Sequence, residues 1–257
     1  MNRPSVTSQA VALTRARLDR PHSADGDPGA QDALCAGMGF SPPEWLRPSI
    51  AARTRFVDSH VVRAIAAGLR QIVLCGAGYD DRPLRFRTPG VRFVELDHPA
   101  TQADKARLLR DLGAGSPGVS LAPVDFRTDD VGAVLERAGH VATEPSLFVA
   151  EGLLIYLDQS TCERLLAALA GRAAAGSVLA VSLATHADGH DSVEVAAAAN
   201  AGRRAGVAEP WLTVLPVAEH LAMLTDAGWQ VTETQWSPVA AAEVSHGRRS
   251  LLVVART

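Results

Sequence analysis

Cysteine is scarce in this chain of 257 residues, which contains three, Cys35, Cys75 and Cys162. They lie far apart and form no C-x-x-C pair, so a disulfide framework or a zinc site is not expected. No apolar stretch approaches the roughly 18 residues of a membrane-spanning helix, and the N-terminus lacks the apolar run of a signal peptide. These absences predict a cytoplasmic protein with no membrane partner.

Basic charge is also limited. The formal net charge is −3, and Lys105 is the only lysine. A protein that binds nucleic acid would carry a basic surface, so no nucleic-acid partner is expected. Apolar residues make up 47% of the sequence and charged residues 21%, which is ordinary for a globular protein, and the length suits one α/β domain.

Short apolar runs alternate with helix-like segments along most of the chain. This alternation predicts a mainly parallel sheet that is covered by helices on both faces. Residues 186–214 interrupt it and are interpreted as an insertion after the fifth strand. Strands are predicted at 71–76, 91–97, 119–125, 146–152 and 177–185, with two more near the C-terminus, and helices at 5–19, 49–68, 99–112, 129–138, 158–171 and 217–229.

Two glycines, Gly76 and Gly78, follow the first predicted strand. In an open parallel sheet, ligands bind at this end of the strands, and a backbone without side chains lets a cofactor approach closely. A tight turn without a ligand would also explain a lone G-x-G. The dinucleotide fingerprint needs a third glycine where this chain has Asp81, and a pyrophosphate would be repelled by Asp80 and Asp81.

Acidic residues also follow the next two strands. Glu95 and Asp97 end the second strand, about 20 residues after the glycines, where a carboxylate can accept hydrogen bonds from ribose hydroxyls. Asp125 and Phe126 end the third strand, where a carboxylate and an aromatic ring could hold an adenine. A cofactor that is cationic, free of phosphate and built on adenosine fits this pattern, which indicates S-adenosylmethionine.

Several ordered motifs resemble one family. The segments "GLRQIVLCGAGYDDRPLRF", "VRFVELDHPATQADKARLL", "LFVAEGLLIYLDQS", "ARTRFVD" and "SVTSQAVALTRA" are similar to those of the leucine carboxyl methyltransferase-like family of S-adenosylmethionine-dependent methyltransferases. The resemblance implies one Rossmann-like class I methyltransferase domain over 1–257, with a mainly parallel seven-stranded sheet. Within it, residues 1–48 would form a helical N-terminal cap, 49–185 the cofactor-binding core, 186–214 a substrate-side insertion, and 215–257 a C-terminal helix and strands.

The resemblance assigns eight residues to the cofactor. Arg53 would pair with the methionyl carboxylate, because a guanidinium group suits a two-point contact. The other seven, from the methionine end to the adenine, are Gly76, Gly78 and Asp80 along the methionine, Glu151 facing its α-amino group, Asp97 at the ribose, and Asp125 and Phe126 beside the adenine.

Three residues depart from the family pattern. Cys75 stands in place of an aliphatic residue, Tyr79 in place of leucine, and Asp81 in place of a small hydroxyl residue. None of these changes removes an assigned contact, but Tyr79 could reshape the entrance and is therefore a candidate substrate residue.

The family includes methyltransferases for protein C-terminal carboxylates and bacterial members that act on small natural products. The predicted function is O-methylation of a carboxylate on a small metabolite of secondary metabolism, which gives a methyl ester. A carboxylate has a reference pKa near ~4 and is ionised at pH 7, so this reaction needs no general base. The lack of an obvious Ser-His-Asp or Cys-His set is compatible with it.

Five further residues are candidates for the substrate side. Tyr156 could reach the substrate carboxylate through its hydroxyl group. His186 could act as a base for a hydroxyl substrate, although a solvated loop histidine is the simpler interpretation. Arg203 and Arg204 could steer an acidic substrate, and Trp211 could close the pocket or anchor the insertion. No metal is expected, because the histidine pair of "THADGHD" has no third ligand.

Other functions stay open at this stage. A protein of this fold could bind the cofactor without transferring its methyl group, as a cyclase or as a non-catalytic partner. Methylation of a protein C-terminus is a further alternative. A nicotinamide oxidoreductase is disfavoured by the missing third glycine, and the sequence does not indicate the oligomeric state.

Overall fold

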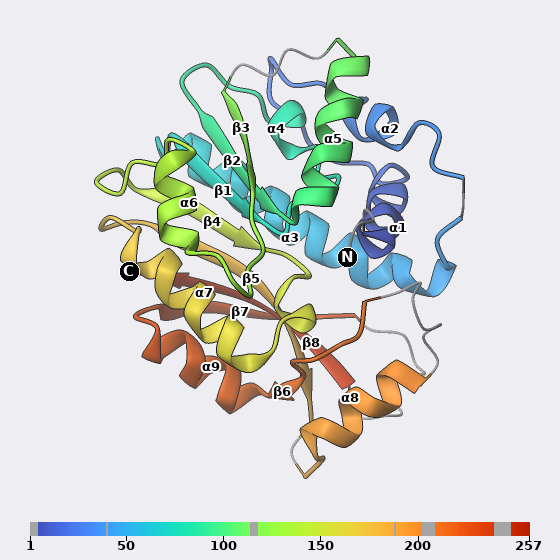
Figure 1. The fold of residues 1–257 in the computed structure, drawn as a ribbon, viewed down its shortest axis with the longest axis vertical. Coiled ribbons are helices and arrows are strands. Elements are labelled where there is room, and N and C mark those ends of the chain that lie inside the picture. The colour runs from blue at the N-terminus through green and yellow to red at the C-terminus, as the bar shows by residue number, and fades with distance from the viewer. Residues whose placement is uncertain (1–4, 40, 114–117, 188, 202–208, 239–247) are drawn as a thin grey trace.

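The computed structural model describes residues 5–39, 41–113, 118–187, 189–201, 209–238 and 248–257 (Figure 1). Its strands are β1 (Gln71–Cys75), β2 (Arg92–Asp97), β3 (Val119–Pro123), β4 (Ser146–Ala150), β5 (Val178–His186), β6 (Leu215–Pro216), β7 (Gln230–Ser237) and β8 (Arg248–Arg256). Its helices are α1 (Val6–Arg15), α2 (Ala30–Cys35), η1 (Glu44–Leu46), α3 (Arg47–Ala66), α4 (Arg82–Arg85), α5 (Pro99–Asp111), α6 (Val131–Arg137), η2 (Leu154–Tyr156), α7 (Gln159–Gly171), α8 (Ser192–Ala201) and α9 (Val217–Asp226).

The strands form one sheet in the order β3-β2-β1-β4-β5-β8-β7. Strands β1 to β5 pair in parallel, whereas β8 runs antiparallel to both of its neighbours. This confirms the predicted α/β class. The sheet differs in one detail from the seven predicted strands, because the short strand β6 also pairs with β5 within the described residues.

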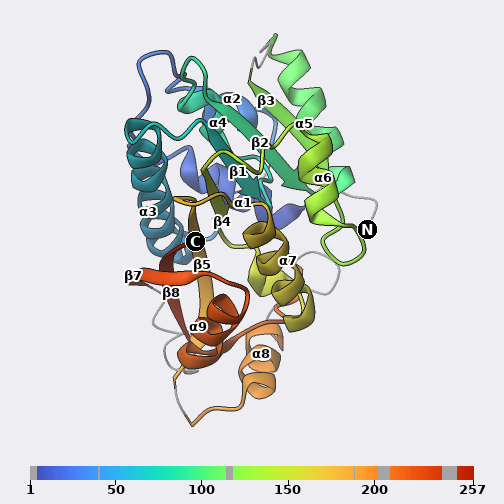
Figure 2. The same ribbon diagram turned by 90° about the vertical axis from the view of Figure 1, so that its left-hand side faces the viewer.

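Apolar side chains of the central strand alternate between the two faces of the sheet. Val73 and Cys75 of β1 pack in the cluster that includes residues of α6, α7 and α9. Ile72 and Leu74 pack on the opposite face with α3. Figure 2 shows α3 and α7 on opposite sides of the sheet. Burial on both faces explains why β1 is a continuous apolar run instead of an alternating one.

Side-chain caps fix where two of the covering helices begin. The Asp130 carboxylate accepts a hydrogen bond from the N–H of Ala133 at 3.0 Å at the start of α6. The Asp158 carboxylate accepts one from Thr161 N–H at 2.8 Å at the start of α7. Such caps satisfy N–H groups that have no partner inside the helix.

The first helix is shorter than predicted. It ends at Arg15, and the chain then turns so that the Arg20 side chain enters the protein. Together α1 and α2 form a cap beside the carboxyl ends of β1 and β2, which places residues from the start of the chain next to the glycine turn (Figure 1). In the part of the chain that is described, no helix has the length and apolar character needed to cross a membrane.

Candidate functional site

A cavity of about 300 Å³ lies at the carboxyl ends of β1, β2 and β4. This is the edge at which open parallel sheets bind ligands. Its walls come from the glycine turn, from Arg53 of α3, from α1, from η2 and, near the end of the insertion, from Glu209, Pro210 and Leu212. The site therefore combines the core with both segments that the sequence places around it.

The turn after β1 depends on glycine. Gly78 has a φ of +51°, and a Cβ atom there would lie 2.7 Å from the Cβ of Ser8, so only glycine lets α1 approach this closely. The N–H of Gly78 donates to Asp97 Oδ2 at 2.7 Å, and the N–H of His98 donates to Asp97 Oδ1 at 2.7 Å. Burial raises the pKa of Asp97, and these two N–H groups act in the opposite direction. Each carboxylate oxygen keeps a lone pair for a further donor.

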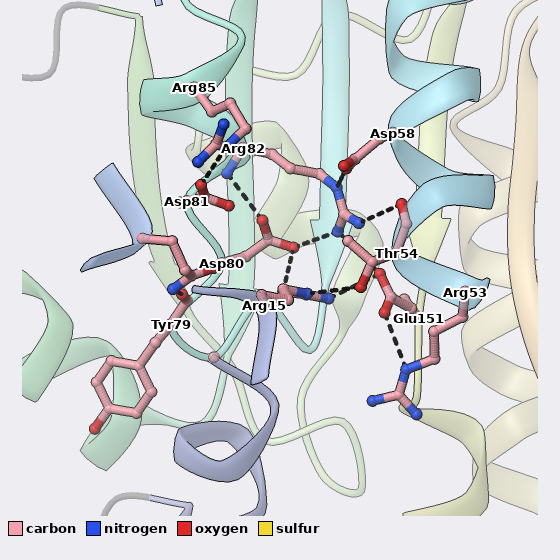
Figure 3. A network of polar contacts seen from close by, with 12 residues as sticks. Arg15, Arg53, Thr54, Asp58, Tyr79, Asp80, Asp81, Arg82, Arg85 and Glu151 are labelled. Atoms are coloured by element: carbon pink, nitrogen blue, oxygen red, sulfur yellow. Dashed lines mark hydrogen bonds and ion pairs between the residues drawn. The ribbon is translucent and has the colours of Figure 1, made fainter. Parts of the chain in front are cut away.

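Three guanidinium groups surround Glu151, the residue after β4 (Figure 3). Arg53 Nε donates to Oε1 at 3.0 Å, while Oε2 lies 2.8 Å from Arg15 Nη2 and 2.9 Å from Arg82 Nη1. Burial by itself would raise the pKa of Glu151, but the charges of Arg15, Arg82 and Arg53 outweigh it and lower the pKa to about 2. The cavity thus contains an ionised carboxylate that is already held by arginines.

Asp80 shares two of these arginines. Its Oδ2 lies 2.6 Å from Arg82 Nη1 and 3.1 Å from Arg15 Nη1, and its Oδ1 accepts the backbone N–H of Arg82 at 2.9 Å. Burial opposes ionisation of Asp80, yet Arg15, Arg82 and Lys105 together hold its pKa well below the usual range. Asp80 is buried and lines the cavity.

A second layer of charged residues supports the first. Arg82 Nε donates to Asp58 Oδ1 at 2.7 Å, and Arg20 Nε donates to Asp58 Oδ2 at 2.8 Å. Asp81 accepts hydrogen bonds from Arg20 and Arg85, both at 2.6 Å. The departure from the family pattern at Asp81 therefore has a structural role, because this carboxylate is fully buried and joins the cap to α4.

This cluster carries more positive than negative charge. Most of its guanidinium groups are buried, but the side chain of Arg53 is 20% exposed, and its Nη atoms point away from Glu151 (Figure 3). Among the described residues, none accepts a hydrogen bond from either Nη group, so Arg53 presents two donors that an anion can bind. The cluster comprises the five arginines Arg15, Arg20, Arg53, Arg82 and Arg85 and the four acids Asp58, Asp80, Asp81 and Glu151.

The opposite end of the cavity is formed by the residues after β3. Phe126 is buried and lines the wall. Asp125 also lines it, and its carboxylate is bound by Arg127, with Nη2 to Oδ2 at 2.7 Å and Nε to Oδ1 at 2.9 Å. Hydrogen bonds from the Arg127 side chain lower the pKa of Asp125 to about 2. Asp125 is therefore an ionised acceptor whose position Arg127 sets.

The two tyrosines proposed for the substrate side lie in different environments. Tyr156, the last residue of η2, lines the cavity and is half-buried. Tyr79 also belongs to the wall, but its side chain is buried against Ala12 and Cys35, and its hydroxyl donates to Asp104 Oδ2 at 2.6 Å. Burial raises the pKa of Tyr79. Tyr79 thus fastens the cap to α5 through its hydroxyl, and that it reshapes the entrance of the cavity stays a prediction.

The other substrate candidates lie outside the cavity wall or outside the described residues. His186 is buried at the end of β5, and its ring nitrogens lie 2.9 Å from Ala187 O and 2.8 Å from Ser192 Oγ. It therefore anchors the start of the insertion and is not placed as a base in the cavity. Trp211 packs against Val195 and Val214 instead of lining the wall, which favours its anchoring role. Arg203 and Arg204 lie outside the described residues.

Residues that the sequence did not single out complete the site. Arg15 bridges Asp80 and Glu151 from α1, and Glu209 also lines the cavity. Arg15 lies between Val11 and Leu18 on one apolar stripe of the first predicted helix, and an arginine at such a position was a usable signal. Glu209 gave no such signal, because only the fold brings it to the cavity. Within the described part of the chain, no group of His, Cys, Asp and Glu side chains could hold a metal ion.

Comparison with known proteins agrees with this geometry. The chain belongs to the leucine carboxyl methyltransferase family, whose profile matches residues 10–170. It is 38% identical over 242 residues to a predicted S-adenosylmethionine-dependent methyltransferase of Frankia alni, covering 86% of this chain and 82% of that one. The chain is therefore an S-adenosylmethionine-dependent methyltransferase, and S-adenosylmethionine is its cofactor.

Solved structures share the fold at low sequence identity. A methyltransferase-like protein of Thermobifida fusca superimposes with a TM-score of 0.62 at 18% identity, over 100% of this chain and 96% of that one. Magnesium protoporphyrin IX methyltransferase of Synechocystis, solved with bound S-adenosylhomocysteine, gives a TM-score of 0.56 at 14% identity, over 88% and 93%. These similarities show the Rossmann-like methyltransferase fold.

Proposed function

We propose that this protein transfers the methyl group of S-adenosylmethionine to a carboxylate oxygen of a small molecule and forms a methyl ester. The observation that carries the proposal is the Arg53 guanidinium group, whose two Nη groups point away from Glu151 while its Nε is fixed by that residue. A methionyl carboxylate bound there would direct the rest of the cofactor along the glycine turn.

The remaining contacts follow from the order of the residues around the cavity. Gly76, Gly78 and Asp80 would line the methionine, and Asp97 would accept hydrogen bonds from the ribose hydroxyls. Glu151, ionised at neutral pH, would face the α-amino group, and Asp125 and Phe126 would hold the adenine. Arg15 would support the same end of the cofactor, because it lies between Asp80 and Glu151.

The chemistry of the cavity supports a carboxylate as the nucleophile. The cofactor supplies a methyl group on a sulfonium, and a carboxylate lone pair forms the new C–O bond as the C–S bond breaks. No proton moves, so no base is needed. His98 is the histidine of the cavity wall, and its Nδ1 accepts the N–H of Ala100 at 3.2 Å as the cap of α5. We therefore assign no catalytic base, and Tyr156 is the candidate for orienting the substrate carboxylate.

The size of the cavity supports a small substrate. A volume of about 300 Å³ is at the lower end of the range for small-molecule sites. The cofactor alone would take up a volume of this order, so an acceptor has little space, and a compact metabolite such as an intermediate of secondary metabolism fits better than a bulky one. These considerations favour a small acid over a protein C-terminus.

The proposal is tested by supplying the purified protein with methyl-deuterated S-adenosylmethionine and a panel of small carboxylic acids. Mass spectrometry should find the labelled methyl group in a methyl ester and an equal amount of S-adenosylhomocysteine. Arg53→Lys should reduce ester formation, and Arg55→Lys, an exposed position on the same helix, should not. Label that appears on a hydroxyl group or a protein C-terminus, or cofactor that binds but is never consumed, would refute the carboxylate assignment; the last result would favour a cyclase or a non-catalytic partner.

A further inference from the structure

Glu209 is an acidic residue in a wall of the cavity that the proposed cofactor contacts do not use. It lies at the end of the insertion, and its side chain lines the cavity. Its Oε2 is buried and has no hydrogen-bond partner among the described residues. An acceptor that is removed from water without a partner costs free energy. Such a group is explained most simply by a ligand that supplies the missing donor.

The segment that carries Glu209 is fixed against η2 by hydrogen bonds. The N–H of Leu212 donates to Ile155 O at 2.7 Å, and the Thr213 hydroxyl donates to Leu157 O at 2.6 Å. Asn200 of α8 binds both the N–H and the carbonyl of Trp211 at 2.9 Å. These contacts hold residues 211–213 beside Tyr156, so Glu209 begins a segment with a defined place in the wall.

Apolar side chains also line the cavity. Leu153, Leu157, Pro210 and Leu212 line it together with Tyr156. In small-molecule sites of this kind, a few polar groups on an apolar wall fix the orientation of the ligand. A carboxylate accepts hydrogen bonds and donates none, so Glu209 selects a ligand that carries a donor.

We propose that Glu209 binds an ammonium or hydroxyl group of the substrate, and therefore that the substrate carries such a donor in addition to the group that is methylated. Together with the proposed function, on which this part rests, the substrate class is a small amino acid or hydroxy acid. Charge sets its orientation, because Glu209 repels a carboxylate and attracts a cation. The donor faces Glu209, and the carboxylate faces the cofactor.

The test is a binding measurement that does not depend on methyl transfer. Protein loaded with S-adenosylhomocysteine is titrated calorimetrically with pairs of acids that differ in one donor, 4-aminobutyrate against butyrate and 4-hydroxyphenylacetate against phenylacetate. The variants are Glu209→Gln, which removes the charge, and Glu209→Leu, which removes the acceptor. Glu194→Gln, at an exposed position on α8, is the matched control.

The wild type and the Glu194 variant should bind the donor-bearing member of at least one pair tenfold or more tightly. The Leu variant should lose this preference, and the Gln variant should lose it for the ammonium compound, while both variants keep their affinity for S-adenosylhomocysteine. Equal affinities within every pair, binding of neither member, or a preference that survives in the Leu variant would overturn the role of Glu209. The proposed function is judged separately, by methyl ester formation.

Discussion

Arg15 and Glu151 lie far apart in the sequence, yet Arg15 Nη2 is 2.8 Å from Glu151 Oε2. Arg15 ends the first helix, and Glu151 follows β4, so this ion pair joins the cap to the centre of the sheet. Both side chains are buried and both line the cavity. The cap is thus part of the cavity that we propose for the cofactor. Both the attachment of the cap and the charge balance of the cavity depend on Arg15.

Replacing Arg15 should weaken both cofactor binding and folding. Arg15→Met leaves Asp80 and Glu151 with one guanidinium fewer in a buried setting, and breaking a buried ion pair costs about 3–5 kcal/mol. We expect unfolding by urea at a lower concentration and an S-adenosylmethionine affinity that is roughly tenfold or more weaker in calorimetry. Arg17→Met is the control, because the side chain of Arg17 is 48% exposed and pairs at the surface. Equal losses in the two variants would show that Arg15 has no special place in the site.

Arg53→Lys should reduce the affinity for S-adenosylmethionine although it keeps the charge. Lysine cannot donate to Glu151 and also present two parallel donors to a carboxylate, as a guanidinium group can. We expect the dissociation constants of both S-adenosylmethionine and S-adenosylhomocysteine to rise roughly tenfold. Stability should change little, because the side chain is partly exposed. Wild-type affinity in this variant would remove Arg53 from the cofactor site.

The sequence was sufficient to predict the sheet and the glycine turn. The continuous apolar run at 71–76 and the helix-like segments that follow it are local sequence patterns, and such patterns determine which element forms. Gly78 could also be predicted from the sequence, because its φ of +51° and the close approach of Ser8 require glycine at that position. These features depend on neighbours in the chain or on one residue type.

The charge cluster could not be predicted in the same way. In the sequence, Asp81 only departs from the family pattern. The structure shows that it pairs with Arg20 and Arg85. His186 and Trp211 were plausible at the cavity because of their chemical type, but the packing of the insertion turns them elsewhere. The pairing of acids with arginines depends on contacts between segments that are distant in the sequence. Local sequence patterns do not show these contacts.

Lowering the pH should destabilise the protein over a pH range that the pKa of Glu151 determines. Its folded pKa of about 2 is below the ordinary value of 4.5, so the unfolded chain takes up the proton first. The contribution of Glu151 is fully present above about pH 4.5 and is lost as the pH falls toward about 2, and Asp80 acts in the same direction. Urea unfolding at several pH values from about 6 to 3 should show this fall. It should be shallower in Arg15→Met, because Arg15 is the charge that most lowers both pKa values. The same slope in both proteins would contradict this account.

Asp97→Ala should weaken cofactor binding by about 1–3 kcal/mol, the usual loss for a charged hydrogen bond. The variant also frees the N–H groups of Gly78 and His98, so calorimetry alone would not separate the ribose contact from support of the turn. Asp97→Asn keeps one carbonyl acceptor and should lose less. Comparison of S-adenosylhomocysteine with its 2′-deoxy and 3′-deoxy analogues makes the distinction. The wild type should prefer the parent compound and Asp97→Ala should not, whereas a preference retained in the variant would place the ribose elsewhere.

Lys105, the only lysine of the chain, should be required for stability without contacting the substrate. Its Nζ lies 2.7 and 2.6 Å from the two oxygens of Glu95 and donates to Asp80 O at 2.7 Å, so it connects α5 to β2 and to the glycine turn. Lys105→Met leaves Glu95 buried without its partner and should lower the free energy of unfolding by about 3–5 kcal/mol. The double variant Lys105→Met with Glu95→Gln should recover part of this loss, because no unpaired charge remains. Arg107→Met, at an exposed position on the same helix, should change stability little, and a double variant no more stable than Lys105→Met alone would show that the ion pair is not the cause.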